Sequence, residues 1–186
     1  MSESKSQKKK LSKDIISIIR TTMRNNIELT HIADNKANVL LTLNSLMLTF
    51  LIPLIIPHIS MIKEMKLYLP LILLIGSGLV TIYMAIMVLK PSSFHEKQRE
   101  LKKGRPISPF FFGNYFQMNR EEFGTYIKSA LSDRDKLESH IVEDLHYIGA
   151  RLGRKLSLIR LAFNVFMVGM FGSILLTFLC FLVFAP

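Results

Sequence analysis

The sequence predicts an all-α membrane protein with three transmembrane helices and cytosolic helical stalk extensions. Three stretches, residues 39–57, 67–89 and 161–184, contain no acidic or basic side chain and no histidine. Each is long enough for a helix to cross a hydrocarbon core about 30 Å thick at about 1.5 Å per residue. A helix of a soluble protein would need a polar face in such a stretch, and none of these has one. The three stretches are therefore predicted to span a membrane.

The formal net charge of +10 lies entirely outside these predicted spans. Basic residues are concentrated before residue 39 and between residues 90 and 160, whereas only Lys63 and Lys66 lie between the first and second spans. The positive-inside rule then places the N-terminus and the segment 91–160 in the cytosol, and the short C-terminus outside. Because membrane topology explains the basic charge, we expect no nucleic-acid partner.

The N-terminal part is predicted to be a disordered basic tail over residues 1–10 and a stalk helix over residues 11–38. The helix is indicated by a stripe with alternating spacings of four and three, which is typical of coiled-coil packing. The stripe consists of Leu11, Ile15, Ile18, Thr22, Asn25, Leu29 and Ile32. Nothing breaks this helix before Pro53, so it is expected to run into the first span. Pro53 and Pro57 are expected to kink or end it.

The segment 91–160 is predicted to combine an aromatic insert with a second stalk helix. Glycine and proline residues break its first part, and an aromatic cluster follows over residues 110–116. Asn119 is predicted to cap a helix that has two glutamates in its first turn. The last helix is predicted to begin at Asp133 and to enter the third span without a proline. Its apolar stripe consists of Leu137, Ile141, Leu145, Ile148, Leu152, Leu156 and Ile159.

The sequence lacks the signatures of catalysis, of metal binding and of ion pumping. The single cysteine, Cys180, excludes an intramolecular disulfide and a metal site built on cysteine pairs. His140 and Asp144 lie one helical turn apart, but a metal site needs three or four convergent ligands. No nucleophile signature accompanies the titratable residues, and no charge lies inside the spans to mark an ion pathway. We expect neither an enzyme nor a pump, and neither a metal nor a cofactor.

The junction between the first stalk and the first span is unusually polar for a helix about to enter lipid. It contains Asn26, Asp34, Asn35, Lys36 and Asn38. One interpretation is an interfacial belt in which Lys36 extends its amine to lipid headgroups. The other is a pocket at the cytosolic mouth that binds a small polar ligand, with amides and a carboxylate for a base and ribose and a lysine for a phosphate. Asp34 and Lys36 project to different sides of the helix, so each is expected to have its own partner.

Aromatic and basic residues later in the chain are further candidates for ligand binding. Phe111 and Phe112, beside Gly113 in a turn, could stack on a nucleobase or form a local apolar core. Three basic residues precede the third span: Arg151, Arg154 and Lys155. The two arginines could hold a phosphate through paired hydrogen bonds or anchor the helix at the membrane surface. The lysine is interpreted as a membrane anchor.

Small polar residues are the only polar groups inside the spans. The second span has Ser77, Thr81 and Ala85 at intervals of four, and the third has Gly169 and Ser173 at the same interval. Both patterns are typical of closely packed helices, within one chain or between chains. Asn44 in the first span is expected to form a hydrogen bond to another helix.

Two sequence boxes, one before the first span and one in the aromatic cluster, are more specific together than either is alone. The first is the run Ala33-Asp34-Asn35-Lys36-Ala37-Asn38, which Arg24-Asn25-Asn26 precedes and Asn44 follows. The second is Pro109-Phe110-Phe111-Phe112-Gly113, followed by a helix with Asp144, Tyr147, Arg154-Lys155 and Arg160-Leu161-Ala162-Phe163-Asn164. In these boxes the chain resembles the Pycsar transmembrane effector family. The resemblance covers nearly the whole chain from about Leu11.

This resemblance implies a role in antiphage defence at the bacterial inner membrane. In that family, a partner cyclase makes a cyclic pyrimidine mononucleotide, cUMP or cCMP, on infection. The membrane effector senses this nucleotide and impairs the inner membrane, so the cell dies before phage are released. By the resemblance, Asp34, Asn35, Lys36 and Asn38, together with the phenylalanine–glycine box, are the best candidates for the sensing region.

A ligand that acts on the spans from the cytosolic side must bind two arrangements of the helices with different affinity. We therefore expect a homo-oligomer in which ligand binding rearranges the stalks and the spans repack into a leaky structure. The alternative is a membrane anchor or assembly module that binds a protein partner and has no ligand of its own. Nucleotide-dependent leakage of liposomes separates the two.

Overall fold

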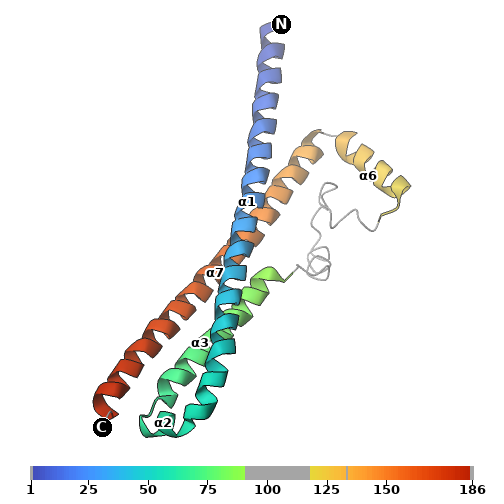
Figure 1. Cartoon of the computed structure of the whole chain (residues 1–186). Coiled ribbons are helices and arrows are strands. Elements are labelled where there is room, and N and C mark those ends of the chain that lie inside the picture. The colour runs from blue at the N-terminus through green and yellow to red at the C-terminus, as the bar shows by residue number, and fades with distance from the viewer. Residues whose placement is uncertain (1, 91–117, 133, 185–186) are drawn as a thin grey trace. The chain divides into compact units, whose positions relative to one another are not determined.

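The computed structural model describes residues 2–90, 118–132 and 134–184, and these residues form helices and no strand (Figure 1). The helices are α1 (Ser2–Ile55), the 3-10 helix η1 (Ile56–His58), α2 (Ile59–Glu64), α3 (Tyr68–Leu89), α6 (Arg120–Ser132) and α7 (Arg134–Phe184). The predicted all-α fold is confirmed for this part of the chain. The predicted breakers and the whole aromatic cluster over residues 110–116, with Phe111, Phe112 and Gly113, lie outside the described residues.

Helix α1 extends further toward the N-terminus than the sequence predicted. It begins at Ser2, so the segment expected to be a disordered tail is helical in the structure. Residues 2–10 contain no proline and no glycine, and therefore nothing in them opposes a helix. They also lack the apolar residues on which a periodicity argument depends. The other end agrees with the prediction, because Pro53 lies in the last turn of α1 and the helix ends at Ile55.

The chain divides into two compact units, which are described separately. Unit 1 comprises residues 1–29 and 91–153, and unit 2 comprises residues 30–90 and 154–186. Helices α1 and α7 are each continuous, and each contributes residues to both units. This continuity confirms the prediction that the helices of the first and third spans extend beyond the spans.

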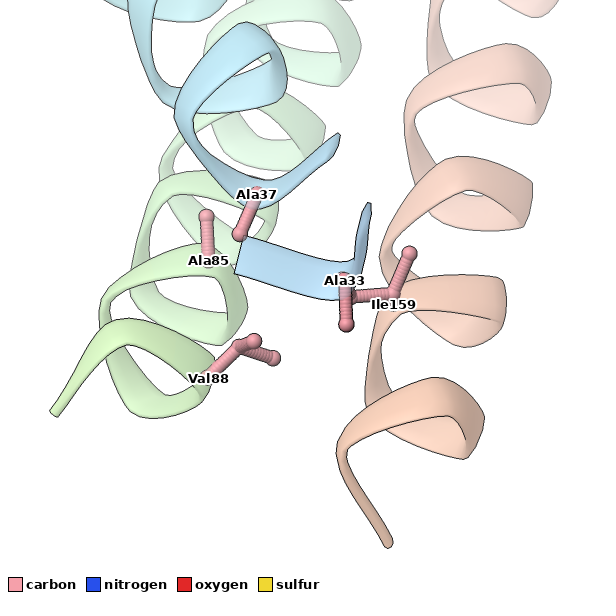
Figure 2. Close-up of a cluster of buried hydrophobic side chains, with 5 residues drawn as sticks. All are labelled: Ala33, Ala37, Ala85, Val88 and Ile159. Carbon is pink, nitrogen blue, oxygen red and sulfur yellow. The ribbon is translucent and has the colours of Figure 1, made fainter. Parts of the chain in front are cut away.

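Unit 2 is built on small side chains where α1, α3 and α7 meet. Its buried apolar cluster consists of Ala33, Ala37, Ala85, Val88 and Ile159 (Figure 2). The two alanines of α1 are completely buried and lie between α3 and α7 in this view. Because alanine has no side chain beyond Cβ, the three backbones can approach closely at this cluster and gain dispersion contacts there.

The outer surface of unit 2 is made of large apolar side chains. Phe50 is 68% exposed and Val168 is 71% exposed. Among the described residues, three helices are long and apolar enough to cross a membrane, and they contain the three predicted spans to within one residue at the start of the second. An arrangement with small residues inside and large apolar residues outside is stable in lipid, where exposed hydrocarbon has no penalty. The fold is thus that of a membrane protein, whereas the orientation of its termini stays a prediction.

The buried face of α1 in unit 2 differs from the predicted stripe. Leu29 and Ile32 are exposed, as are Ile15 and Ile18 earlier in the helix. The residues that are buried instead are Ala33, Ala37, Leu40 and Asn44. The prediction assumed that the larger apolar residues face the helix partner, as they do in water. The buried residues instead run from Ala33 into the first span, where lipid accepts large apolar side chains and small residues mark the contact between helices.

At one end of unit 2, the turn between α2 and α3 contacts the end of α7. Lys66 in this turn has a positive φ of 53°, the left-handed conformation that residues with a Cβ seldom adopt. Its ammonium lies 4.3 Å from the centre of the Phe184 ring, and its carbonyl accepts a long hydrogen bond from Sγ of Cys180 at 3.8 Å. These contacts connect the turn to the end of α7 and help to hold the strained residue in place.

In unit 1, helix α6 begins with the predicted cap. The side chain of Asn119 accepts a hydrogen bond from the backbone N–H of Glu122 at 2.8 Å. The carboxylate of Glu122 in turn accepts one from the backbone N–H of Asn119 at 3.1 Å. This reciprocal pair is a capping box, which satisfies two backbone donors that the first turn of a helix leaves without a partner.

Candidate functional site

An ion pair between α1 and α7 marks the polar end of the bundle in unit 2. Nζ of Lys155 donates a hydrogen bond to Oδ1 of Asp34 across 2.6 Å. The side chain of Lys155 is 22% exposed and that of Asp34 is 34% exposed, so water reaches the pair without surrounding it. The two residues are 121 positions apart in the sequence. This pair is therefore a specific contact between the two helices that continue into the first and third spans.

In the structure, some residues of the Ala-Asp-Asn-Lys-Ala box pack against other helices and the others are exposed. The two alanines point into the apolar cluster, and Asp34 lies beside them and reaches α7. The remaining three predicted site residues on this stretch, Asn35, Lys36 and Asn38, are exposed. The prediction that Asp34 has a partner of its own is confirmed. The box thus combines two closely packed alanines with one inward ionic group, and its other polar side chains are exposed.

Other predicted site residues lie in different surroundings. Arg154 is exposed on α7 in unit 2. In unit 1, the guanidinium of Arg151 lies 5.8 Å from the centre of the Tyr147 ring, one helical turn away. This is the geometry of a cation–π contact, which orients the arginine along its own helix. Asn26 is half-buried on α1 and takes part in a polar or ring contact. Within unit 2, the described residues bring together Asp34 and Lys155.

Lys155 has a contact that the sequence did not predict. It was interpreted as a membrane anchor, yet its ammonium is held by the carboxylate of Asp34. A signal for this pairing was present in the sequence. Asp34 precedes the first span by five residues and Lys155 precedes the third by six, so both lie at similar depth on helices that enter the membrane in the same direction. Equal depth and opposite charge would have favoured the pair.

Deeper in unit 2, neutral polar side chains line the interior between the three helices. Thr81 is completely buried, and its hydroxyl donates to the carbonyl of Ser77 at 2.8 Å. The hydroxyl of Ser173 on α7 donates to the carbonyl of Pro70 on α3 at 3.0 Å. Hydroxyl groups inside a membrane helix bundle usually find such carbonyl partners, because an unpaired donor in hydrocarbon is costly.

Asn44 does not form the hydrogen bond across helices that the sequence predicted. Its amide nitrogen donates to the carbonyl of Leu40, one turn earlier on the same helix, at 2.8 Å. Its side-chain oxygen has no hydrogen-bond partner, although the residue is completely buried. Leaving such a group without a partner costs about 1 to 3 kcal/mol. At the level of Asn44, the interior of unit 2 is therefore polar and contains a hydrogen-bond acceptor without a donor.

Close backbone approach accounts for the small-residue patterns of the second and third spans. A Cβ atom added to Gly169 would overlap the side chain of Ser77, so α3 and α7 are in direct contact there. A Cβ atom on Gly78 would lie 3.3 Å from the side-chain oxygen of Asn44. The predicted close packing is thus confirmed within one chain, and glycine is required at Gly169 for lack of space.

The titratable groups outside the spans show one clear perturbation. Burial raises the pKa of the Tyr126 hydroxyl, and the negative charge of Asp144 raises it further. Asp144 is itself buried and takes part in a polar or electrostatic contact. Among the described residues, no group of three or more His, Cys, Asp and Glu side chains is placed to hold a metal ion.

These features define a helical membrane protein whose polar helical extensions are continuous with its spans and are tied together by an ion pair at the entrance. A sequence model of the family described as the Pycsar effector protein domain matches residues 18–185. The chain therefore belongs to the Pycsar effector family, which gives it a role in Pycsar antiphage defence and a functional link to a cyclic nucleotide cyclase and a membrane. No curated protein and no solved structure matches the chain.

Proposed function

We propose that this protein senses a cyclic pyrimidine mononucleotide, cUMP or cCMP, made by a partner cyclase, and impairs the integrity of the bacterial inner membrane. The resulting loss of the infected cell is abortive infection, and the protein is an effector without catalytic activity of its own. The observation that carries the proposal is the Asp34–Lys155 pair, because it joins the two helices that continue into the first and third spans. A change at this ion pair can therefore act on both spans directly through the two helices.

The phosphate of the nucleotide is the natural trigger for such a pair. An anion that approaches Lys155 competes with the carboxylate of Asp34 for the same ammonium group. Exposed Asn35, Lys36, Asn38 and Arg154 offer further hydrogen bonds to a ligand at this end of the bundle. The amides suit a base edge and a ribose, and the cations suit a phosphate. We propose that Asn26, Arg151 and the box Phe111, Phe112 and Gly113 complete the sensing region.

The trigger changes the spans only if the ligand prefers one arrangement of the helices. Moving a two-state equilibrium from 1:99 to 99:1 takes about 5.5 kcal/mol of differential binding. One phosphate contact supplies part of this, and several ligands acting on one homo-oligomer supply the rest. We therefore propose that several chains assemble and that the spans repack together once the ion pair is exchanged for the phosphate.

The experiment is dye release from liposomes that contain the purified protein, with cUMP, cCMP, cAMP or cGMP added, together with nucleotide binding in detergent. We expect leakage with a cyclic pyrimidine nucleotide, and weaker leakage or none with the purine nucleotides. An anchor or assembly module would insert into the liposomes and show no nucleotide-dependent leakage. That result, with no binding of any nucleotide, would disprove the proposed function.

Two substitutions at the ion pair are predicted to act in opposite directions. Lys155→Ala removes the proposed phosphate contact and should weaken nucleotide binding about 10- to 100-fold, the equivalent of about 1.5 to 3 kcal/mol for a charged hydrogen bond. Asp34→Asn removes the competing charge and should shift leakage to lower nucleotide concentration. Lys63→Ala, an exposed lysine on α2 at the other end of the bundle, is the matched control. Equal weakening by both pair variants would mean that the pair only stabilises the fold.

A further inference from the structure

The interior of unit 2 carries a line of neutral polar side chains that the sensing function does not use. We call it the polar seam, and it consists of Asn44 on α1, Ser77 and Thr81 on α3, and Ser173 on α7. Asn44 and Thr81 are completely buried and Ser173 is 6% exposed. All three membrane helices therefore direct polar groups toward one another, while the surface around them is apolar.

Asn44 is the member of the seam whose side chain lacks a hydrogen-bond partner for its oxygen. One amide hydrogen is used on the carbonyl of Leu40, and the side-chain oxygen accepts nothing. This oxygen faces the backbone of Gly78, a glycine that offers no side chain to donate to it. Among the described residues inside the spans, it is the one buried side-chain oxygen or nitrogen without a hydrogen-bond partner. A strong acceptor enclosed in this way binds water as soon as water can enter.

The hydroxyl groups of the seam have hydrogen-bond acceptors in the packed bundle and remain able to bind water. Thr81 and Ser173 each donate to a backbone carbonyl, and their oxygen lone pairs remain available as acceptors. The Ser173 hydrogen bond and the contact of Gly169 with Ser77 both hold α7 against α3. If α7 moves away from α3, the Ser173 hydroxyl loses its acceptor on α3 and can turn to water, whereas Thr81 keeps the hydrogen bond within its own helix and offers its oxygen to water as an acceptor. The seam is dry while the helices are packed and hydrophilic once they separate.

We propose that the leak opened by this effector runs through the polar seam, between α1, α3 and α7 of one chain, with Asn44 as its central water-binding residue. The ligands of this site are water and then small hydrated ions. Because the seam has no charged side chain, the path should discriminate little between cations and anions. The inference rests on the proposed membrane-permeabilising function, and it opposes leakage along the lipid-facing surface, where residues such as Phe50 and Val168 offer water no partner.

Cysteine accessibility distinguishes the two routes. The native Cys180 is first replaced by alanine, and cysteine is then placed at Asn44, Thr81 or Val168 in separate variants. A charged methanethiosulfonate reagent reacts with thiols that water reaches. We expect Asn44→Cys and Thr81→Cys to react at least about tenfold faster when cUMP or cCMP is present. Val168→Cys, on the lipid-facing surface, should stay unreactive in both conditions.

Leakage itself gives the second measurement. Asn44→Leu keeps the approximate volume of the side chain but removes its hydrogen-bonding groups, so we expect slower dye release with unchanged nucleotide binding. Asn44→Ser should retain the leak, because a hydroxyl also binds water. Two results would disprove the seam as the leak path while leaving the proposed function intact. One is that Asn44→Leu leaks like the wild type. The other is that Asn44→Cys leaks when nucleotide is added but does not react with the reagent. Wild-type protein that binds no nucleotide and never leaks would overturn both.

Discussion

The bundle of unit 2 and the α6–α7 part of unit 1 bury different kinds of side chain. The bundle buries small apolar residues and neutral polar ones such as Asn44 and Thr81. Outside the spans, unit 1 buries the carboxylate of Asp144, whose charge acts on Tyr126. Lipid makes a buried charge very costly and a large exposed apolar residue harmless, whereas water allows charged groups close to the surface. The comparison shows that close packing dominates inside the spans, whereas in unit 1 a buried charge acts on a neighbouring titratable group.

The largest effect is expected where the fit of the bundle is tightest. Gly169→Val places a branched side chain where even a Cβ would overlap Ser77, so α3 and α7 must separate. We expect a loss of about 1 to 3 kcal/mol or more, which unfolding of the detergent-solubilised protein in sodium dodecyl sulfate would measure. Gly76→Val is the control, because no heavy atom lies within 4 Å of a Cβ at that position. Similar losses in both variants would show that the close contact is not limiting.

The features that the sequence predicted correctly are those fixed by neighbours along the chain. The three spans follow from uninterrupted apolar composition, the end of α1 from its proline, and the cap at Asn119 from an amide placed before two glutamates. Each depends on residues within a few positions of one another. Asp34 faces α7 whereas Asn38 is exposed, and local sequence does not separate the two, since whether a helical residue faces inward depends on the partner helix.

The features that the sequence did not predict are set by contacts between distant residues. The face that α1 turns toward α3 and α7 could not be read from hydrophobicity, because lipid and protein both accept apolar side chains. The partner of Asp34 lies 121 residues away, so no local spacing indicates it. Asn44 was expected to bond across helices, but the residue opposite its oxygen is Gly78, which has no side-chain donor.

An intermediate effect is expected at the Asp34–Lys155 pair, where the bundle approaches water. Asp34→Asn, Lys155→Met and the double variant form a double-mutant cycle, and unfolding free energies should give a coupling of about 1 to 3 kcal/mol. Because both side chains are partly shielded, most of the coupling should persist at high salt, which screens fully exposed pairs. A coupling near zero, or one abolished by salt, would place the pair with ordinary surface ion pairs and weaken its role as a trigger.

The smallest effect is expected in unit 1, where it depends on pH. The folded state keeps the proton on Tyr126 to a higher pH than the unfolded state does, because burial and Asp144 disfavour the phenolate. This part of the stability is complete below about pH 10, the pKa of an unperturbed tyrosine, and is lost as pH rises through the folded pKa. Tyr126→Phe should flatten the alkaline loss of helical signal in circular dichroism, and Asp144→Asn should bring ionisation of Tyr126 to lower pH. The chain contains five tyrosines and no tryptophan, so tyrosinate absorbance reports on the tyrosines alone, and its difference between the wild type and Tyr126→Phe isolates the titration of Tyr126. An unchanged titration in Asp144→Asn would leave burial as the whole cause and remove electrostatics from the contrast between the two units.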